Sequence, residues 1–109
     1  MTRRSIAIPI VSAMCAATVL AAHAENALLQ GKALVETNCA RCHAISATDT
    51  SSHPDAPAFR TLSQRYPIDQ LAEALAEGIS TGHPDMPEFI ASPQQIDAIL
   101  AYIGSLQSK

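Results

Sequence analysis

The sequence of 109 residues predicts an all-α fold, with two longer helices at the ends of one domain and two shorter helices between them. Three observations lead to this prediction. Apolar residues recur every three or four positions in several stretches, which is the period of one helix face. No stretch shows the alternation of apolar and polar residues that is typical of a half-buried strand. Prolines and a serine-proline pair stand where helices are expected to begin.

The N-terminus has the pattern of a secretory signal peptide. A basic start at residues 2–4 is followed by an apolar run at 6–20 and by Ala22-His23-Ala24, an A-x-A cleavage site. We therefore predict a signal peptide over residues 1–24 and a single domain over 25–109. The alternative is an uncleaved anchor, because residues 5–22 are about long enough to span a bilayer. In that case the exported domain stays attached to the membrane.

The first helix of the domain is expected to start near Asn26, a possible N-cap, and to run toward Cys39. Gly31 lies on its apolar stripe, although glycine in a helix costs about 1 kcal/mol relative to alanine. The helix either tolerates this glycine or another element crosses closely there. Tyr102, near the other end of the chain, is the candidate for the crossing; the alternative is an ordinary half-exposed tyrosine.

The last helix has the strongest start signal. Ser92 is a potential N-cap, Pro93 suits the first helical position, and Gln95 completes a capping box. Its apolar stripe is expected to be Ile96, Ile99, Leu100, Ile103 and Leu106.

Two shorter helices are expected in the middle of the chain. Residues 57–64 form the first and present Phe59 and Leu62 to the core. The second starts at Pro67 and closes at Gly78. Its stripe is Ile68, Leu71, Leu75 and Ile79. Residues 46–56 have the composition of a loop.

The sequence Cys39-Ala40-Arg41-Cys42-His43 is a C-x-x-C-H motif, which is typical of covalent haem attachment. On a helical turn the spacing brings Cys39, Cys42 and His43 to one face. We predict one haem c per chain, bound through the two cysteines, with His43 as an iron ligand. The alternatives are a redox dithiol, half of a zinc site, or a structural disulfide. Zinc would require further ligands at metal spacing, and no strand precedes the motif as in thioredoxin-like proteins.

Met86 is the predicted second iron ligand. It is the only methionine beyond the signal peptide, and Pro84 and Pro87 on either side restrict its loop. A thioether is a soft neutral ligand that raises the reduction potential of a haem ligated by histidine. The alternatives are a methionine that fills a gap in the core, or ligation by His83, with His53 a weaker rival.

Three further residues are candidates for haem contacts. Pro57 is expected to accept a hydrogen bond from His43 through its carbonyl, because ligating histidines usually donate their second ring N–H. Arg60 and Arg65 are the candidate donors to the haem propionates, as the only arginines between the two predicted ligands. The alternatives are a proline that only begins a helix and arginines that are solvated.

The domain is acidic. Residues 25–109 contain five basic and ten acidic side chains, a net charge of −5. Nucleic acid is therefore an unfavourable partner. A protein with a basic docking surface suits this charge better, since opposite fields raise encounter rates.

These residues together resemble a class I mono-haem c-type cytochrome of the bacterial periplasm. The resemblance covers nearly the whole predicted domain and implies the cytochrome c fold, in which the helices wrap around one covalently bound haem. In that family a glycine eight residues before the first motif cysteine, as Gly31 is, lies where the N- and C-terminal helices cross at an aromatic residue. The run 99–103 with Tyr102 fits this partner.

The resemblance implies a periplasmic one-electron carrier rather than an enzyme, because both axial positions of the iron are filled by the protein. We expect a monomer, a dehydrogenase as donor, and an oxidase or another cytochrome as acceptor. Two alternatives remain. The first is a haem subunit of a dehydrogenase complex. The second is a haem sensor or peroxidase-like protein in which Met86 dissociates.

Overall fold

The computed structural model describes residues 11–78 and 83–108, and side chains from residue 16 onward. It contains helices α1 (Val11–Asn38), α2 (Leu71–Glu77) and α3 (Pro93–Leu106), and two 3₁₀ helices, η1 (Phe59–Gln64) and η2 (Ile68–Gln70). The described residues contain no strand. The all-α prediction is therefore confirmed.

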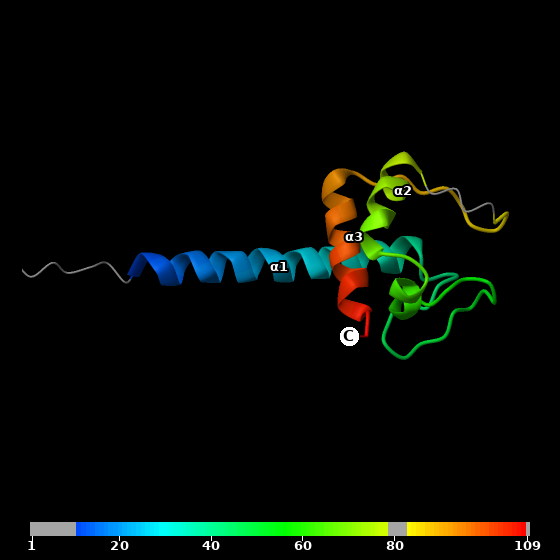
Figure 1. The fold of residues 1–109 in the computed structure, drawn as a ribbon, viewed down its shortest axis with the longest axis horizontal. Coiled ribbons are helices and arrows are strands. Elements are labelled where there is room, and N and C mark those ends of the chain that lie inside the picture. Colours follow the sequence, from blue (N-terminus) through cyan, green and yellow to red (C-terminus); the bar gives the residue numbers. More distant parts are fainter. Residues whose placement is uncertain (1–10, 79–82, 109) are drawn as a thin grey trace, which may run out of the picture.

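Helix α1 begins upstream of the position that the sequence suggested. It passes through Ala24 and Glu25 without a break, so Asn26 lies inside the helix and the prediction of an N-cap there is wrong for the full chain. The first part of α1 projects away from the other helices (Figure 1). The residues of the predicted signal peptide fall partly outside the description. Within the described part, no helix is both long and apolar enough to cross a membrane.

The predicted crossing at Gly31 is present. Helix α3 lies across the C-terminal half of α1 in Figure 1, and this pair makes the most extensive contact between elements. A Cβ atom at Gly31 would collide with the carbonyl oxygen of Ala98 and would lie 2.9 Å from the Cβ of Tyr102. The Tyr102 hydroxyl donates a hydrogen bond of 2.7 Å to the carbonyl of Ile45. Tyr102 therefore joins α3 both to α1 and to the loop behind the C-x-x-C-H motif.

The boundaries of α3 follow its sequence signals. Ser92 is the N-cap, with its hydroxyl accepting from the backbone N–H of Gln95, while the Gln95 side chain accepts from the N–H of Ser92. This reciprocal pair satisfies two backbone donors that the helix cannot pair internally.

The middle helices are shorter than expected and are partly 3₁₀ helices rather than α-helices. The segment predicted at 57–64 is the 3₁₀ helix η1, and the segment predicted from Pro67 begins as η2 before α2. Helix α2 ends at Gly78, whose φ of 92° lies in the region that favours glycine. Ile79, predicted on the stripe of this helix, lies outside the described residues.

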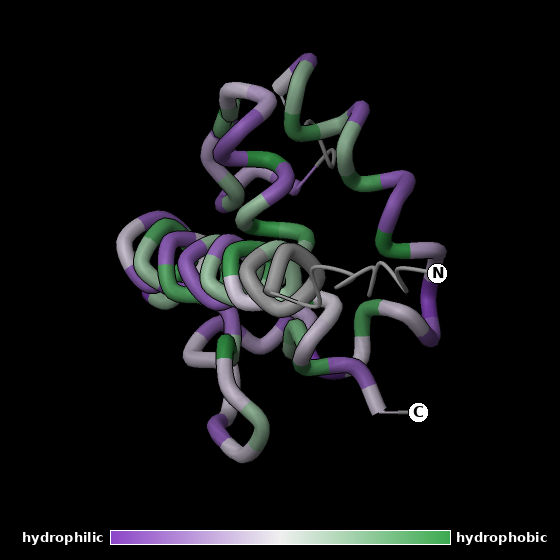
Figure 2. The backbone as a smooth tube through the Cα atoms, turned by 90° about the vertical axis from the view of Figure 1, so that its left-hand side faces the viewer, coloured by the Kyte–Doolittle hydropathy of each residue, from purple (hydrophilic) through white to green (hydrophobic). Residues whose placement is uncertain are grey.

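One apolar core joins all these elements. Figure 2 looks along α1, with the rest of the chain arranged around it. The buried members of the core are Val35, Phe59, Leu62, Leu75, Ala91, Ile96, Ile99 and Ile103. Since α1, η1, α2 and α3 each contribute side chains to the core, the motif at the end of α1 is held against the other elements.

Candidate functional site

The C-x-x-C-H motif forms a turn that continues α1. The N–H of Cys39 donates to the carbonyl of Val35 at 2.9 Å, and the N–H of His43 donates to the carbonyl of Cys39 at 2.9 Å. These bonds keep the helical spacing through the motif, as expected. Cys39 and Cys42 are half-buried free thiols, so the structure contains no disulfide between them. Burial raises the pKa of the Cys39 thiol to about 11.

The His43 imidazole is fixed by two neighbours. Its Nδ1 lies 2.8 Å from the carbonyl oxygen of Pro57, which is the hydrogen bond that the sequence suggested. Its ring packs against Phe59, with ring centroids 4.9 Å apart. With Nδ1 bonded to a carbonyl, Nε2 is the ring nitrogen left to act as a ligand.

A cavity of about 660 Å³ lies in front of the motif. It is mostly apolar, and its wall includes Leu62, Leu71, Leu75, Ile99 and Ile103. The motif residues Cys39, Cys42 and His43 also line it. Cavities of ~300–1,000 Å³ with an apolar wall and few polar groups are typical of cofactor sites.

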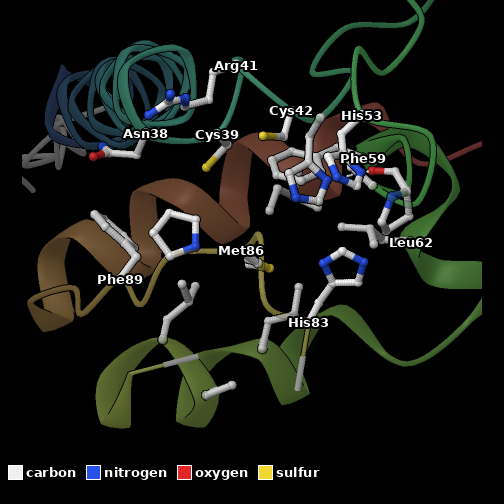
Figure 3. Close-up of a pocket in the computed structure, with 18 of the residues that line it drawn as sticks. Asn38, Cys39, Arg41, Cys42, His53, Phe59, Leu62, His83, Met86 and Phe89 are labelled. Atoms are coloured by element: carbon white, nitrogen blue, oxygen red, sulfur yellow. Dashed lines mark hydrogen bonds between the residues drawn. The ribbon is translucent and has the colours of Figure 1, made fainter. Parts of the chain in front are cut away.

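Met86 lies on the other side of this cavity from the cysteines. Figure 3 shows the sulfurs of Cys39 and Cys42 at one wall and the half-buried Met86 at the facing wall, with His83 beside it. Met86 comes from the loop between α2 and α3, and its N–H donates to the carbonyl of His83 at 3.2 Å. The cavity therefore brings together two thiols, one thioether and three imidazoles, of which His43 belongs to the motif. This donor set fits a flat apolar group that carries two covalent attachment points and a soft metal centre.

The two rival histidines both line the cavity but have other partners. His53 Nε2 lies 3.2 Å from an Asp85 carboxylate oxygen, and His83 Nε2 lies 3.4 Å from an Asp55 carboxylate oxygen. Their rings contact each other edge to face, with centroids 5.3 Å apart. Among the described residues, no three His, Cys, Asp or Glu side chains are placed to hold a metal ion.

The two arginines predicted to meet the propionates are not at the cavity. Arg60 donates to the carbonyls of Ser46 and Asp49, at 3.3 and 2.7 Å, and its guanidinium lies 3.6 Å from the Asp49 carboxylate. This binding to the 46–49 loop turns Arg60 away from the site. Arg65 is exposed and does not line the cavity either.

Other polar residues, which sequence reasoning did not select, are at the cavity. Asn38, Arg41 and Tyr66 all line the cavity. Arg41 stands between the two motif cysteines, so its position was a signal in the sequence; Tyr66 reaches the wall only through the tertiary fold.

Comparisons with known proteins agree with this geometry. The model of the family described as Cytochrome c matches residues 28–107. A protein of Synechocystis sp. described as "Cytochrome c-553-like" is 30% identical over 77 residues, which cover 71% of this chain and 67% of that protein. No solved structure matches the chain with significance.

Proposed function

Since this chain belongs to the cytochrome c family, whose members carry covalently bound haem c, we propose that it is a periplasmic one-electron carrier. The observation that carries the proposal is the mostly apolar cavity, which Cys39, Cys42 and His43 line and in which Met86 faces the two cysteines (Figure 3). Haem c supplies an iron that alternates between the ferric and ferrous states. The residues of this chain would hold that group and set its potential.

We assign the thioether bonds to Cys39 and Cys42 and the axial positions to His43 and Met86. The bond from His43 Nδ1 to Pro57 supports this, because it orients the imidazole and increases its electron donation. The partners of His53 and His83 support Met86 over either histidine, since each imidazole already faces a carboxylate.

Among the polar residues that line the cavity, Tyr66 is our candidate donor to a haem propionate. Asn38 and Arg41 stand beside the cysteines, which would bond the vinyl edge of the porphyrin, and the propionates are on the opposite edge.

Filled axial positions favour electron transfer over catalysis. If His43 and Met86 both held the iron in its two oxidation states, the geometry would change little on electron transfer and a substrate would find no open coordination position. Members of this family are in general electron carriers rather than enzymes.

The signal peptide over residues 1–24 remains part of the proposal. Its support is that the described residues 16–26 are exposed, with Leu20 72% exposed. An exposed apolar helix of this kind is unfavourable on a mature protein in water. An uncleaved signal would make it a membrane anchor.

Acidic residues at the cavity support the proposal that the redox partner has a basic docking surface. Asp55, Asp85 and Glu88 line the cavity and are exposed. With an acidic chain behind them, these carboxylates favour encounter with a basic protein through long-range attraction.

An optical redox titration of the exported protein tests the function. We expect one reversible one-electron wave, with the haem remaining on the polypeptide in a denaturing gel and lost from the Cys39→Ser, Cys42→Ser double variant. A protein that consumes peroxide at a catalytic rate, or that shows no reversible wave, contradicts the proposal.

A further inference from the structure

Four side chains from two loops meet beside the cavity. His53 and Asp55 belong to the loop between the C-x-x-C-H motif and η1, and His83 and Asp85 belong to the loop that carries Met86. The contacts are reciprocal, because each histidine pairs with the aspartate of the other loop. The two rings also meet edge to face. These pairs join segments that are about 30 residues apart in sequence.

In the hydrogen bond between His53 and Asp85, the histidine is the donor. The N–H of Asp55 donates to His53 Nδ1 at 3.2 Å, so this nitrogen carries no proton. In the neutral imidazole the proton then lies on Nε2, which points at an Asp85 carboxylate oxygen 3.2 Å away. The His53 side chain is only 26% exposed, although Asp85 is 66% exposed. The less exposed His53 side chain therefore holds the more exposed carboxylate of Asp85.

The loop of His53 is itself tied to the motif. The N–H of His53 donates to the carbonyl of Cys42 at 3.2 Å. Further along the same loop, Pro57 accepts the hydrogen bond from His43. A group bonded to His53 is therefore positioned relative to the motif and its histidine.

The Met86 loop has a second attachment on the other side of Met86. The N–H of Ala91 donates to the carbonyl of Leu75 at 2.9 Å, and Phe89 packs against the core. The loop is thus held at residues 89–91 by α2 and the core, and at residues 83–85 by the histidine–aspartate pairs. Met86 lies between these two attachments.

We propose that His53 is a positioning residue that holds the Met86 loop across the cavity through its hydrogen bond to Asp85. The inference rests on the proposed function, in which Met86 is an iron ligand. Loss of this bond leaves residues 83–85 attached only through the pair of His83 and Asp55, and so lowers the fraction of protein in which the Met86 sulfur would ligate the iron. Carbon monoxide, which competes for that position on ferrous haem, then binds more readily.

The test uses the exported protein with its haem. We expect His53→Ala to raise the apparent affinity of the reduced protein for carbon monoxide about fivefold, the factor that one net hydrogen bond corresponds to. The ferric sulfur-to-iron absorption band should weaken and the reduction potential should fall. His53→Gln, whose amide N–H can still donate to Asp85, should retain most of the parent behaviour.

Asp85→Ala removes the same bond from the exposed side, so it keeps the test decisive if His53→Ala folds poorly. The two effects should not add in the double variant, because they remove one interaction. Parent-like carbon monoxide affinity in both single variants, additive effects, or no rescue by glutamine would overturn the inference. A parent protein that lacks the sulfur band would instead contradict the assignment of Met86, and so the proposed function itself.

Discussion

The contact between α1 and α3 at Gly31 gives a sharp prediction of stability. In Gly31→Ala the new methyl group would collide with the Ala98 carbonyl oxygen, and would lie 2.6 Å from the Ala98 carbonyl carbon and 2.9 Å from the Tyr102 Cβ. These are backbone atoms or the first atom of a side chain, so no rotamer change relieves the clash. The two helices must separate instead, which loosens the buried contact between α1 and α3.

The expected magnitude follows from two opposing effects. Overpacking a tight contact costs up to about 3 kcal/mol. Alanine favours a helix interior by about 1 kcal/mol over glycine. We therefore expect Gly31→Ala to lower the free energy of unfolding by about 2 kcal/mol, the difference between these terms.

Gly104→Ala is the matched control. Gly104 also lies in a helix, but a Cβ atom there would meet nothing within 4 Å. This variant should be more stable than the parent by about 0.5–1 kcal/mol, from helix propensity and the less flexible unfolded chain. Urea unfolding of the haem-containing protein, followed by circular dichroism, measures both values. A Gly31→Ala protein as stable as the parent would refute the close crossing.

Four further predictions follow from the site and its supports. Met86→Ala should lower the reduction potential, on the order of 0.1 V within the ~0.8 V that axial ligands span, and should let carbon monoxide bind the reduced protein; an unchanged potential would refute ligation. Ser92→Ala should cost about 1 kcal/mol in urea unfolding through loss of the capping box, and an unchanged midpoint would contradict it. Tyr102→Phe should also cost about 1 kcal/mol by leaving the carbonyl of Ile45 unpaired; equal stability would show that water replaces the hydroxyl. In the haem-free chain, burial raises the pKa of the Cys39 thiol from 9.0 to about 11, so its contribution to stability should be full below pH 9 and lost as the pH rises through 11. Urea midpoints at pH 8 and pH 10.5, compared with Cys39→Ser, measure this, and parallel curves would contradict the buried thiol.

The features that the sequence could predict depend on local geometry or on strong chemical signals. The capping box at Ser92 and the glycine at position 78 are satisfied within a few residues, so their structures follow from their own segments. The C-x-x-C-H spacing likewise defines a turn by itself. Gly31 was informative because a glycine on an apolar helix stripe is costly unless something lies close to it.

The features that the sequence could not predict depend on contacts between distant segments. Arg60 was placed at the haem because it lies between the predicted ligands, but the carbonyls of the 46–49 loop bind it instead. The pair of His53 and Asp85 spans 32 residues and depends on how two irregular loops fold. The start of α1 was missed because residues 16–25 continue a helical pattern across the predicted cleavage site.

The visible and near-infrared spectrum of the exported protein, oxidised and reduced, with and without carbon monoxide, tests the central claim most directly. The account predicts a low-spin haem with a weak ferric sulfur-to-iron band and only weak binding of carbon monoxide to the reduced protein. That result would establish ligation by His43 and Met86 and support electron transfer. A spectrum without the sulfur band, together with ready binding of carbon monoxide, would contradict it and indicate an open or labile iron site.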